Sequence, residues 1–129
     1  MREGGCVIDH VTLQVTDVPA SQAFYEAVLA PLGIRAGHTD GAAVGFSGNG
    51  PGSFWLCPAL REDDRELHIA FTAPSRDVVH AFHRAALEIG AEVLHAPRTF
   101  PEYHEAYFGC FIRDPDGHNL EAVCHLAEP

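Results

Sequence analysis

Two histidines and one glutamate stand at positions from which they could bind a metal ion together. His10 and His68 lie 58 residues apart, each in a run of alternating apolar and polar residues. Glu121 lies inside the apolar run Asn119-Leu120-Glu121-Ala122-Val123, where a carboxylate is costly to bury without a charge partner. Two imidazoles and one carboxylate can form a facial triad, which holds a divalent metal and leaves positions open for substrate and water. The hypothesis requires all three side chains to reach one concavity.

The 58-residue spacing extends beyond the histidines and indicates a duplicated unit. At this shift, apolar residues align without gaps: Val11 with Ile69, Leu13 with Phe71, Ala23 with Ala81, Phe24 with Phe82, Ala27 with Ala85 and Leu29 with Leu87. We therefore expect two copies of one supersecondary unit, over about residues 6–58 and 66–126, within a single domain of residues 1–129. The charged connector 58–65 is too short to separate two domains.

Each copy is predicted to fold as a strand, a helix and further strands. In the first copy we expect strand 7–15, a helix capped by Asp17 that ends near Gly33, and strands at about 34–38, 42–47 and 53–58. In the second copy we expect strand 66–73, a helix capped by Ser75, and strands near 91–95, 106–113 and 118–126. Asp114-Pro115-Asp116-Gly117 predicts a tight hairpin turn between the last two strands.

The strand alternation places each candidate ligand on the face that does not pack against a helix. His10 shares its face with Thr12 and Gln14, His68 with Ala70 and Thr72, and Glu121 with Val123 and His125. If the two copies pack side by side, these polar faces meet. Any one of these histidines taken alone is better interpreted as a half-buried structural residue. The matched placement of two, with a glutamate in an apolar strand, favours a metal site.

The second copy carries an insertion, residues 101–107, that the first copy lacks. It contains Tyr103, His104 and Tyr107, which could supply a general base and a hydrogen-bond donor beside a metal. The alternative interpretation is a polar loop whose aromatic side chains cover the rim of the fold. Both interpretations remain open at this point.

Composition excludes several classes of function. The chain has 129 residues, 47% hydrophobic and 20% charged, which is typical of a globular domain. A net charge of -10 repels phosphate backbones and anionic lipid, so we expect no nucleic-acid or membrane partner. No apolar run approaches the roughly 18 residues of a membrane span, and the first ten residues lack a signal-peptide core, so we expect a cytoplasmic protein. The four cysteines, widely separated, indicate neither a disulfide framework nor a zinc knuckle.

Three segments carry a resemblance to a known family: His10-Val11-Thr12-Leu13, His68-Ile69-Ala70-Phe71 and, above all, the run from Phe111 to Glu121 (FIRDPDGHNLE). They resemble the glyoxalase / bleomycin-resistance / extradiol-dioxygenase superfamily, also called the vicinal oxygen chelate proteins. The resemblance covers nearly the whole chain. It implies an α+β fold in which two βαβββ modules form a curved, barrel-like mixed sheet with the helices on the outer face. It also implies a divalent metal (Fe, Mn, Zn or Ni) bound by His10, His68 and Glu121.

The resemblance implies a metal-dependent enzyme acting on a small molecule that is chelated through adjacent oxygens. Lyase or isomerase chemistry and ring-cleaving dioxygenase chemistry both remain open. Glyoxalase I enzymes usually add a fourth ligand from the strand that reads Ser53-Phe54-Trp55-Leu56-Cys57 here, where no carboxylate or imidazole stands. The alternative is a non-catalytic, bleomycin-resistance-like protein that binds a small molecule on the same sheet. Relatives are often dimers, so we expect a homodimer, with the site inside one chain or shared between chains.

Overall fold

The computed structural model describes residues 9–49, 53–59 and 67–127. The chain divides into two compact units, Met1–Asp64 and Arg65–Pro129, called here the first and second modules. Most of the predicted connector 58–65 lies outside the described residues. Among the helices described, none is long and apolar enough to cross a membrane.

The first module is a βαβββ unit. Its elements are β1 (His10–Val15), α1 (Val18–Leu29), the short 3-10 helix η1 (Ala30–Leu32), β2 (Arg35–Asp40), β3 (Ala43–Ser47) and β4 (Ser53–Pro58). The strands lie in the order β1-β4-β3-β2, with β1 parallel to β4 and the other pairs antiparallel. The helical crossover from β1 to β2 makes these two strands run in the same direction. The chain then reverses twice, from β2 to β3 and from β3 to β4, so that β4 runs parallel to β1.

The second module repeats this plan. Its elements are β5 (His68–Thr72), α2 (Arg76–Glu88), β6 (Val93–Thr99), β7 (Phe108–Arg113) and β8 (Asn119–Cys124), with the strand order β5-β8-β7-β6. The pairing of β5 with β8 is parallel, and the other two pairings are antiparallel. The predicted α+β fold of two βαβββ modules is confirmed. In the described part of each module the sheet is curved and open rather than closed into a barrel.

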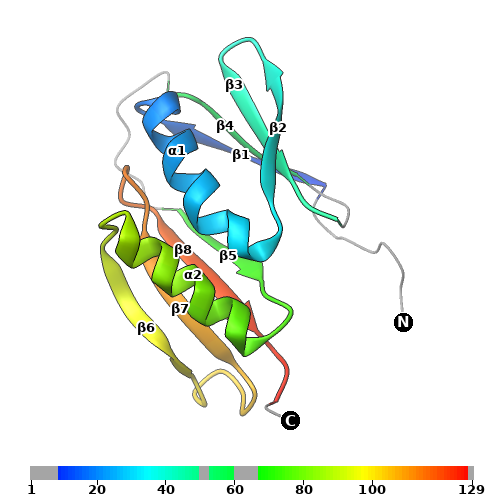
Figure 1. Cartoon of the computed structure of the whole chain (residues 1–129), viewed down its shortest axis with the longest axis vertical. Helices are drawn as coiled ribbons and strands as arrows, with labels where there is room; N and C mark the ends of the chain where they lie inside the picture. The colour runs from blue at the N-terminus through cyan, green and yellow to red at the C-terminus, as the bar shows by residue number, and fades with distance from the viewer. Residues whose placement is uncertain (1–8, 50–52, 60–66, 128–129) are drawn as a thin grey trace. The chain divides into compact units, whose positions relative to one another are not determined.

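In each module the helix lies across one face of its own sheet (Figure 1). The helix-facing side holds the fully buried core, which in the first module includes Leu13, Tyr25, Phe46 and Leu56 and in the second Phe82, Ile112 and Leu120. Because strand side chains alternate, the next residue along each strand points to the opposite face. The candidate ligands therefore lie on the faces away from the helices, as the alternation predicts.

Strand β6 differs most from its prediction. It runs from Val93 to Thr99 rather than over 91–95, although it contains Pro97. Proline removes a backbone donor, and it is tolerated on an edge strand whose pairing is irregular. β6 is the edge strand of its sheet, and its register against β7 shifts twice, between Val93 and His95 and between His95 and Arg98.

The predicted turn between β7 and β8 is built around Asp114. Its Oδ1 accepts hydrogen bonds from the backbone N–H groups of Asp116 (2.9 Å) and His118 (2.8 Å). Gly117 takes a positive φ of 87°, which glycine adopts without a steric penalty. The turn fixes the register that places Glu121 opposite Phe111.

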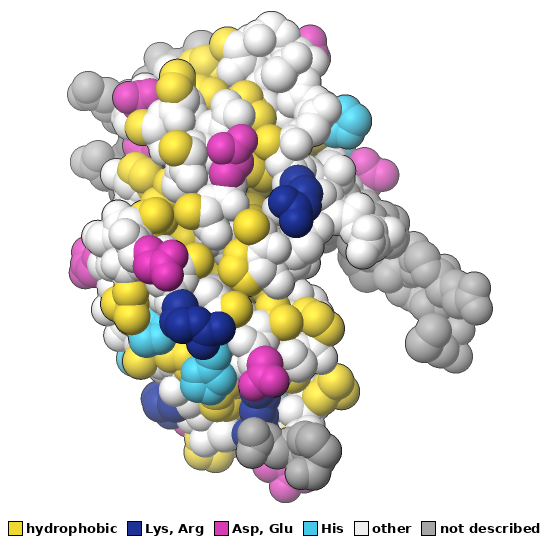
Figure 2. Space-filling model, viewed as in Figure 1, with side chains coloured by type: hydrophobic (Ala, Val, Ile, Leu, Met, Phe, Trp, Pro, Cys, Tyr) yellow, Lys and Arg dark blue, Asp and Glu magenta, His cyan; other side chains and the backbone are white. Residues whose placement is uncertain are grey.

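Acidic side chains are dispersed over the face shown in Figure 2 rather than gathered into one patch. Some of the basic and imidazole groups on that face lie over α2, which carries Arg76, His80, His83 and Arg84, and others lie over the first module.

Both predicted helix caps are present. The Asp17 side chain accepts from the N–H of Ala20 (3.1 Å), and the Ser75 hydroxyl accepts from the N–H of Val78 (3.3 Å). Each cap satisfies one of the backbone donors that a helix start leaves unpaired.

We predict that Ser75→Ala lowers the free energy of unfolding by about 1 kcal/mol, because the N–H of Val78 loses its acceptor. Ser75→Asp keeps a side-chain acceptor and serves as the matched control, which should remain close to wild type. Equilibrium urea denaturation followed by far-UV circular dichroism measures both. An equal loss in the two variants would contradict a capping role.

Candidate metal and substrate site

Glu121 is a carboxylate buried in the sheet of the second module. It sits in the middle of β8, between Ala70 of β5 and Phe111 of β7, and only 2% of it is exposed. Burying a charged carboxylate is costly unless partners replace its water. The partners that the structure provides are one imidazole and one phenol.

The imidazole belongs to His68, the first residue of β5. Its Nε2 lies 3.0 Å from Oε1 of Glu121, and its side chain is 51% exposed. The His68 ring also meets the edge of the Phe111 ring, with centroids 5.7 Å apart. Two of the three predicted metal ligands are thus adjacent, one buried and one open to solvent.

The phenol belongs to Tyr107, whose hydroxyl donates a hydrogen bond to Oε2 of Glu121. Gly109 makes room for this contact, because a Cβ at that position would lie 3.1 Å from Oε2 of Glu121 and 3.4 Å from the Tyr107 ring. A side chain at 109 would therefore crowd both the carboxylate and its donor.

Two groups near Glu121 have altered acidities. Burial raises the pKa of the Tyr107 hydroxyl well above its usual value, and the hydrogen bond to Glu121 and the charge of that carboxylate raise it further. Burial, followed by the charge of Glu121, raises the pKa of the Cys110 thiol to about 12. Tyr107 therefore stays protonated and acts as a hydrogen-bond donor at neutral pH.

His118 holds β5 in register beside this site. The residue is 8% exposed, and its Nδ1 accepts a hydrogen bond from the N–H of Leu67 (3.0 Å). The N–H of Asn119 donates to the carbonyl of Leu67 (2.8 Å), so both backbone groups of Leu67 are held. Because Leu67 directly precedes His68, this double contact positions the imidazole. The sequence interpretation gave His118 no role, since its partner lies 51 residues away in the chain.

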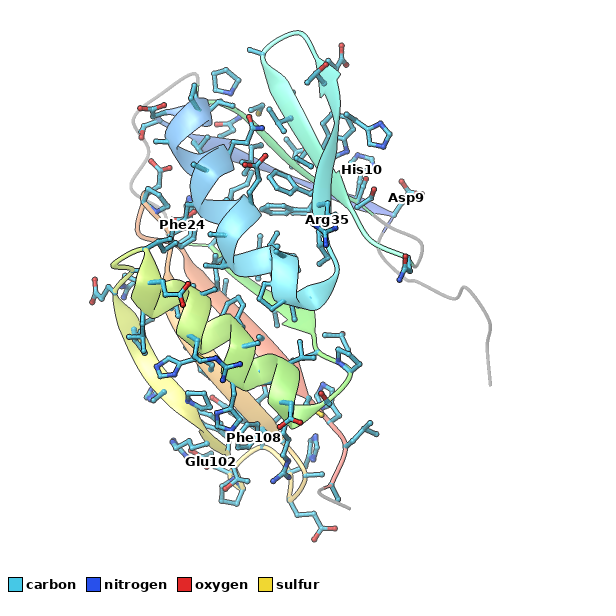
Figure 3. The ribbon with its side chains drawn as sticks, in the orientation of Figure 1. Asp9, His10, Phe24, Arg35, Glu102 and Phe108 are labelled. Carbon is cyan, nitrogen blue, oxygen red and sulfur yellow. The ribbon has the colours of Figure 1, made fainter. Side chains whose placement is uncertain are left out.

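His10, the third predicted ligand, lies in the first module, at the start of β1 opposite Ser53. Its side chain is 59% exposed, and its Nδ1 lies 3.0 Å from Oδ1 of Asp9 (Figure 3). A carboxylate on Nδ1 favours the tautomer whose Nε2 carries a lone pair. Asp9 is a functional candidate that the sequence interpretation missed, although its place beside His10 was visible.

The structure brings the insertion residues together around Tyr107. The Tyr103 ring lies 4.8 Å from the Tyr107 ring, and the His104 ring lies 5.5 Å from it, centroid to centroid. His104 Nδ1 accepts from the N–H of Ala106, and its Nε2 lies 2.9 Å from Nδ1 of His125. With both rings neutral, these partners assign the proton to Nε2 of His104, which donates to His125.

Within the described ranges, no group of three or more His, Cys, Asp or Glu side chains forms a cluster that could hold a metal ion. His68 and Glu121 form a pair within the second module, and His10 with Asp9 forms another within the first.

A family model described as the Glyoxalase/Bleomycin resistance protein/Dioxygenase superfamily matches residues 7–122. The chain belongs to this superfamily. The matched region contains His10, His68, Tyr107 and Glu121, so both pairs lie inside the superfamily domain. A search of curated proteins found no match.

Solved structures of the superfamily share the fold. A glyoxalase/bleomycin resistance protein from Albidiferax ferrireducens superposes with a TM-score of 0.80 at 24% identity, over 92% of this chain and 99% of that chain. A lactoylglutathione lyase from Agrobacterium tumefaciens superposes with a TM-score of 0.70 at 20% identity, over 93% of this chain and 94% of that chain. At these identities the likeness concerns the fold.

We predict that Tyr107→Phe lowers the free energy of unfolding by about 1–3 kcal/mol, because buried Glu121 loses a donor. Tyr103→Phe is the matched control, since the Tyr103 side chain is 61% exposed and removal of its hydroxyl should have little effect. Urea denaturation at neutral pH measures both variants. Equal stability of Tyr107→Phe and wild type would contradict the importance of this hydrogen bond.

Proposed function

We propose that this protein is a divalent-metal-dependent enzyme of the glyoxalase/dioxygenase type, acting on a small molecule chelated through adjacent oxygens. His10, His68 and Glu121 are the proposed ligands. The observation that carries the proposal is the buried carboxylate of Glu121 beside the half-exposed Nε2 of His68. A buried carboxylate beside a solvent-exposed imidazole lowers the stability of the fold when no cation is bound. The same pair of groups is well suited to binding a cation.

The separation of two of the proposed ligand atoms supports a site for a small divalent ion. Nε2 of His68 and Oε1 of Glu121 lie 3.0 Å apart. Two ligand atoms about 2.1 Å from one ion and at right angles are separated by roughly 3 Å. The Nδ1 contact of His10 with Asp9 is the outer contact typical of a metal-binding histidine. Imidazole and carboxylate together suit Fe, Mn, Zn or Ni.

A bound ion would supply Lewis acidity that stabilises negative charge on the chelated oxygens of a substrate. The Tyr107 hydroxyl donates a hydrogen bond to Oε2 of Glu121 and so fixes the orientation of the carboxylate. We propose Tyr107 as the hydrogen-bond donor of the site. His104 and Tyr103, which contact the Tyr107 ring, are the proposed proton-transfer residues.

A metal-free binding protein is the second candidate function. It is favoured by one observation, which is that both oxygens of Glu121 already have partners within the protein, His68 and Tyr107. In that case the non-helix faces would bind a small molecule without catalysis.

Metal titration separates the two functions. We predict one divalent ion per chain by calorimetry and elemental analysis of the purified protein, and at least about 100-fold weaker binding in His68→Ala and Glu121→Ala. His80→Ala, which removes an exposed histidine of α2, is the matched control and should bind like wild type. Absence of stoichiometric metal, or equal binding by all variants, would overturn the enzyme proposal. Oxygen uptake with catechols and hemithioacetal isomerisation then distinguish the two reaction types.

We further propose that residues 1–129 act as one domain and that the protein is a homodimer. Joint refolding of equal amounts of the His10→Ala and Glu121→Ala variants tests whether His10 binds the metal of its own chain or that of the partner chain. If His10 completes the site of the other chain, mixed dimers regain one intact site, and metal binding should recover to about a quarter of the wild-type capacity. If His10 serves its own chain, no binding should return. A monomer by size-exclusion chromatography would contradict the homodimer.

A further inference from the structure

Two histidines fasten the insertion between β6 and β7 to the C-terminal end of β8. Nε2 of His104, in the insertion, lies 2.9 Å from Nδ1 of His125, the residue that follows β8. The two rings also stack, with centroids 5.2 Å apart and planes 24° from parallel. Both residues are exposed, so water can deliver a proton to either ring. This pair is called here the histidine latch.

The hydrogen-bond partners fix where each ring of the latch carries its proton. The backbone N–H of Ala106 donates to Nδ1 of His104 (3.1 Å), so the proton of neutral His104 is on Nε2. Nε2 of His104 donates in turn to Nδ1 of His125, whose own proton is therefore on Nε2. In both rings the nitrogen without a proton, Nδ1, already accepts a hydrogen bond.

A neutral imidazole can take up a second proton only at the nitrogen that lacks one. A proton added to Nδ1 of His125 would face the N–H of His104, and a proton added to Nδ1 of His104 would face the N–H of Ala106. Either event replaces a hydrogen bond with two donors that point at each other. The latch with both of its hydrogen bonds therefore exists only when both rings are neutral.

Tyr107 connects the latch to the buried carboxylate of Glu121. Its ring lies 5.5 Å from the His104 ring and 5.3 Å from the His125 ring, centroid to centroid. Its backbone N–H donates to the carbonyl of His104 (3.2 Å), and its hydroxyl donates to Oε2 of Glu121. A movement of His104 therefore acts directly on the residue that donates to the carboxylate.

Charged groups near the latch do not compensate for a proton on it. The other charged and titratable groups on the surrounding elements are Arg98 of β6, Glu102, Tyr103, Glu105 and Tyr107 of the insertion, and Glu121 and Cys124 of β8. Arg98 pairs with Glu102 (3.4 Å), and α2 presents Arg76 and His80 to the Phe108 ring. Among the residues that the structure describes, no carboxylate forms an ion pair with His104 or His125.

We propose that the histidine latch is a proton-sensitive device, which holds the insertion against the end of β8 near neutral pH and releases it as the pH falls. Imidazoles take up protons between about pH 8 and about pH 5, so the latch should open within this range. Opening frees His104 and loosens Tyr107 above Glu121. The device needs no metal, so it goes beyond the proposed function and stands or falls separately from it.

The whole chain, freed of metal with EDTA and labelled with ¹⁵N, allows the latch to be followed by nuclear magnetic resonance. The backbone N–H of Tyr107 is the reporter, because its acceptor is the carbonyl of His104. Its exchange with water, corrected for the pH dependence of intrinsic exchange, should be about tenfold faster at about pH 5 than at about pH 7.5, since a hydrogen bond that holds its acceptor is lost. Ring resonances of Tyr107 should move over the same pH range.

Three variants distinguish the latch from other effects of pH. In His125→Asn, the side-chain oxygen can accept from Nε2 of His104 but takes up no proton, so slow exchange of the Tyr107 N–H should persist at about pH 5. In His125→Ala the acceptor is absent, so exchange should be fast at both pH values. His80→Ala removes a histidine of α2 and is the matched control, which should switch like wild type.

Equal corrected exchange of the Tyr107 N–H at both pH values in the wild type would overturn the proposal. So would wild-type switching in His125→Asn or in His125→Ala, because the pH dependence would then arise elsewhere. Switching in a protein that binds no metal would support the latch while contradicting the enzyme proposal. Metal binding without switching would contradict the latch alone.

Discussion

The carboxylate of Glu121 lies within a sheet whose other buried positions are apolar, and it has exchanged nearly all of its water for contacts with two side chains, His68 and Tyr107. This exchange constrains the residues around it. β7 carries glycine at position 109 because a side chain there would crowd the carboxylate. Tyr107 must remain protonated to donate to Oε2, and β5 must hold His68 within reach of Oε1. Because an unpaired buried carboxylate would destabilise the fold, the polar face of the second module depends on these contacts.

The contacts that support Glu121 come from parts of the chain far apart in sequence. The Asp114 turn sets the register of β7 against β8, and His118, at the end of that turn, holds the residue before His68. The turn Asp114–Gly117, which is part of the run that resembles the superfamily, therefore positions the site residues. It links the hairpin that carries Glu121 to the strand that carries the imidazole.

The two modules share one architecture and use their outward faces differently. The second module places a buried carboxylate and several aromatic rings on its face, whereas the first places the indole of Trp55 over Gly45. Both arrangements need a glycine opposite a large or charged group, Gly109 in one case and Gly45 in the other. The repeated unit gives both modules the same strands and helix. Gly109 and Gly45 leave room for the different groups that lie on the two sheets.

The sequence alone determined the duplicated α+β fold, both helix caps, the tight turn and the face on which each candidate ligand lies. These features follow from spacing within a few residues or from the 58-residue repeat, and both are visible in a linear chain. Only the tertiary structure decided that Tyr107 reaches Glu121, that His118 holds Leu67, and that Trp55 lies flat on Gly45. Those contacts join residues on different strands, and they depend on register and side-chain direction, which residue types along the chain do not encode locally.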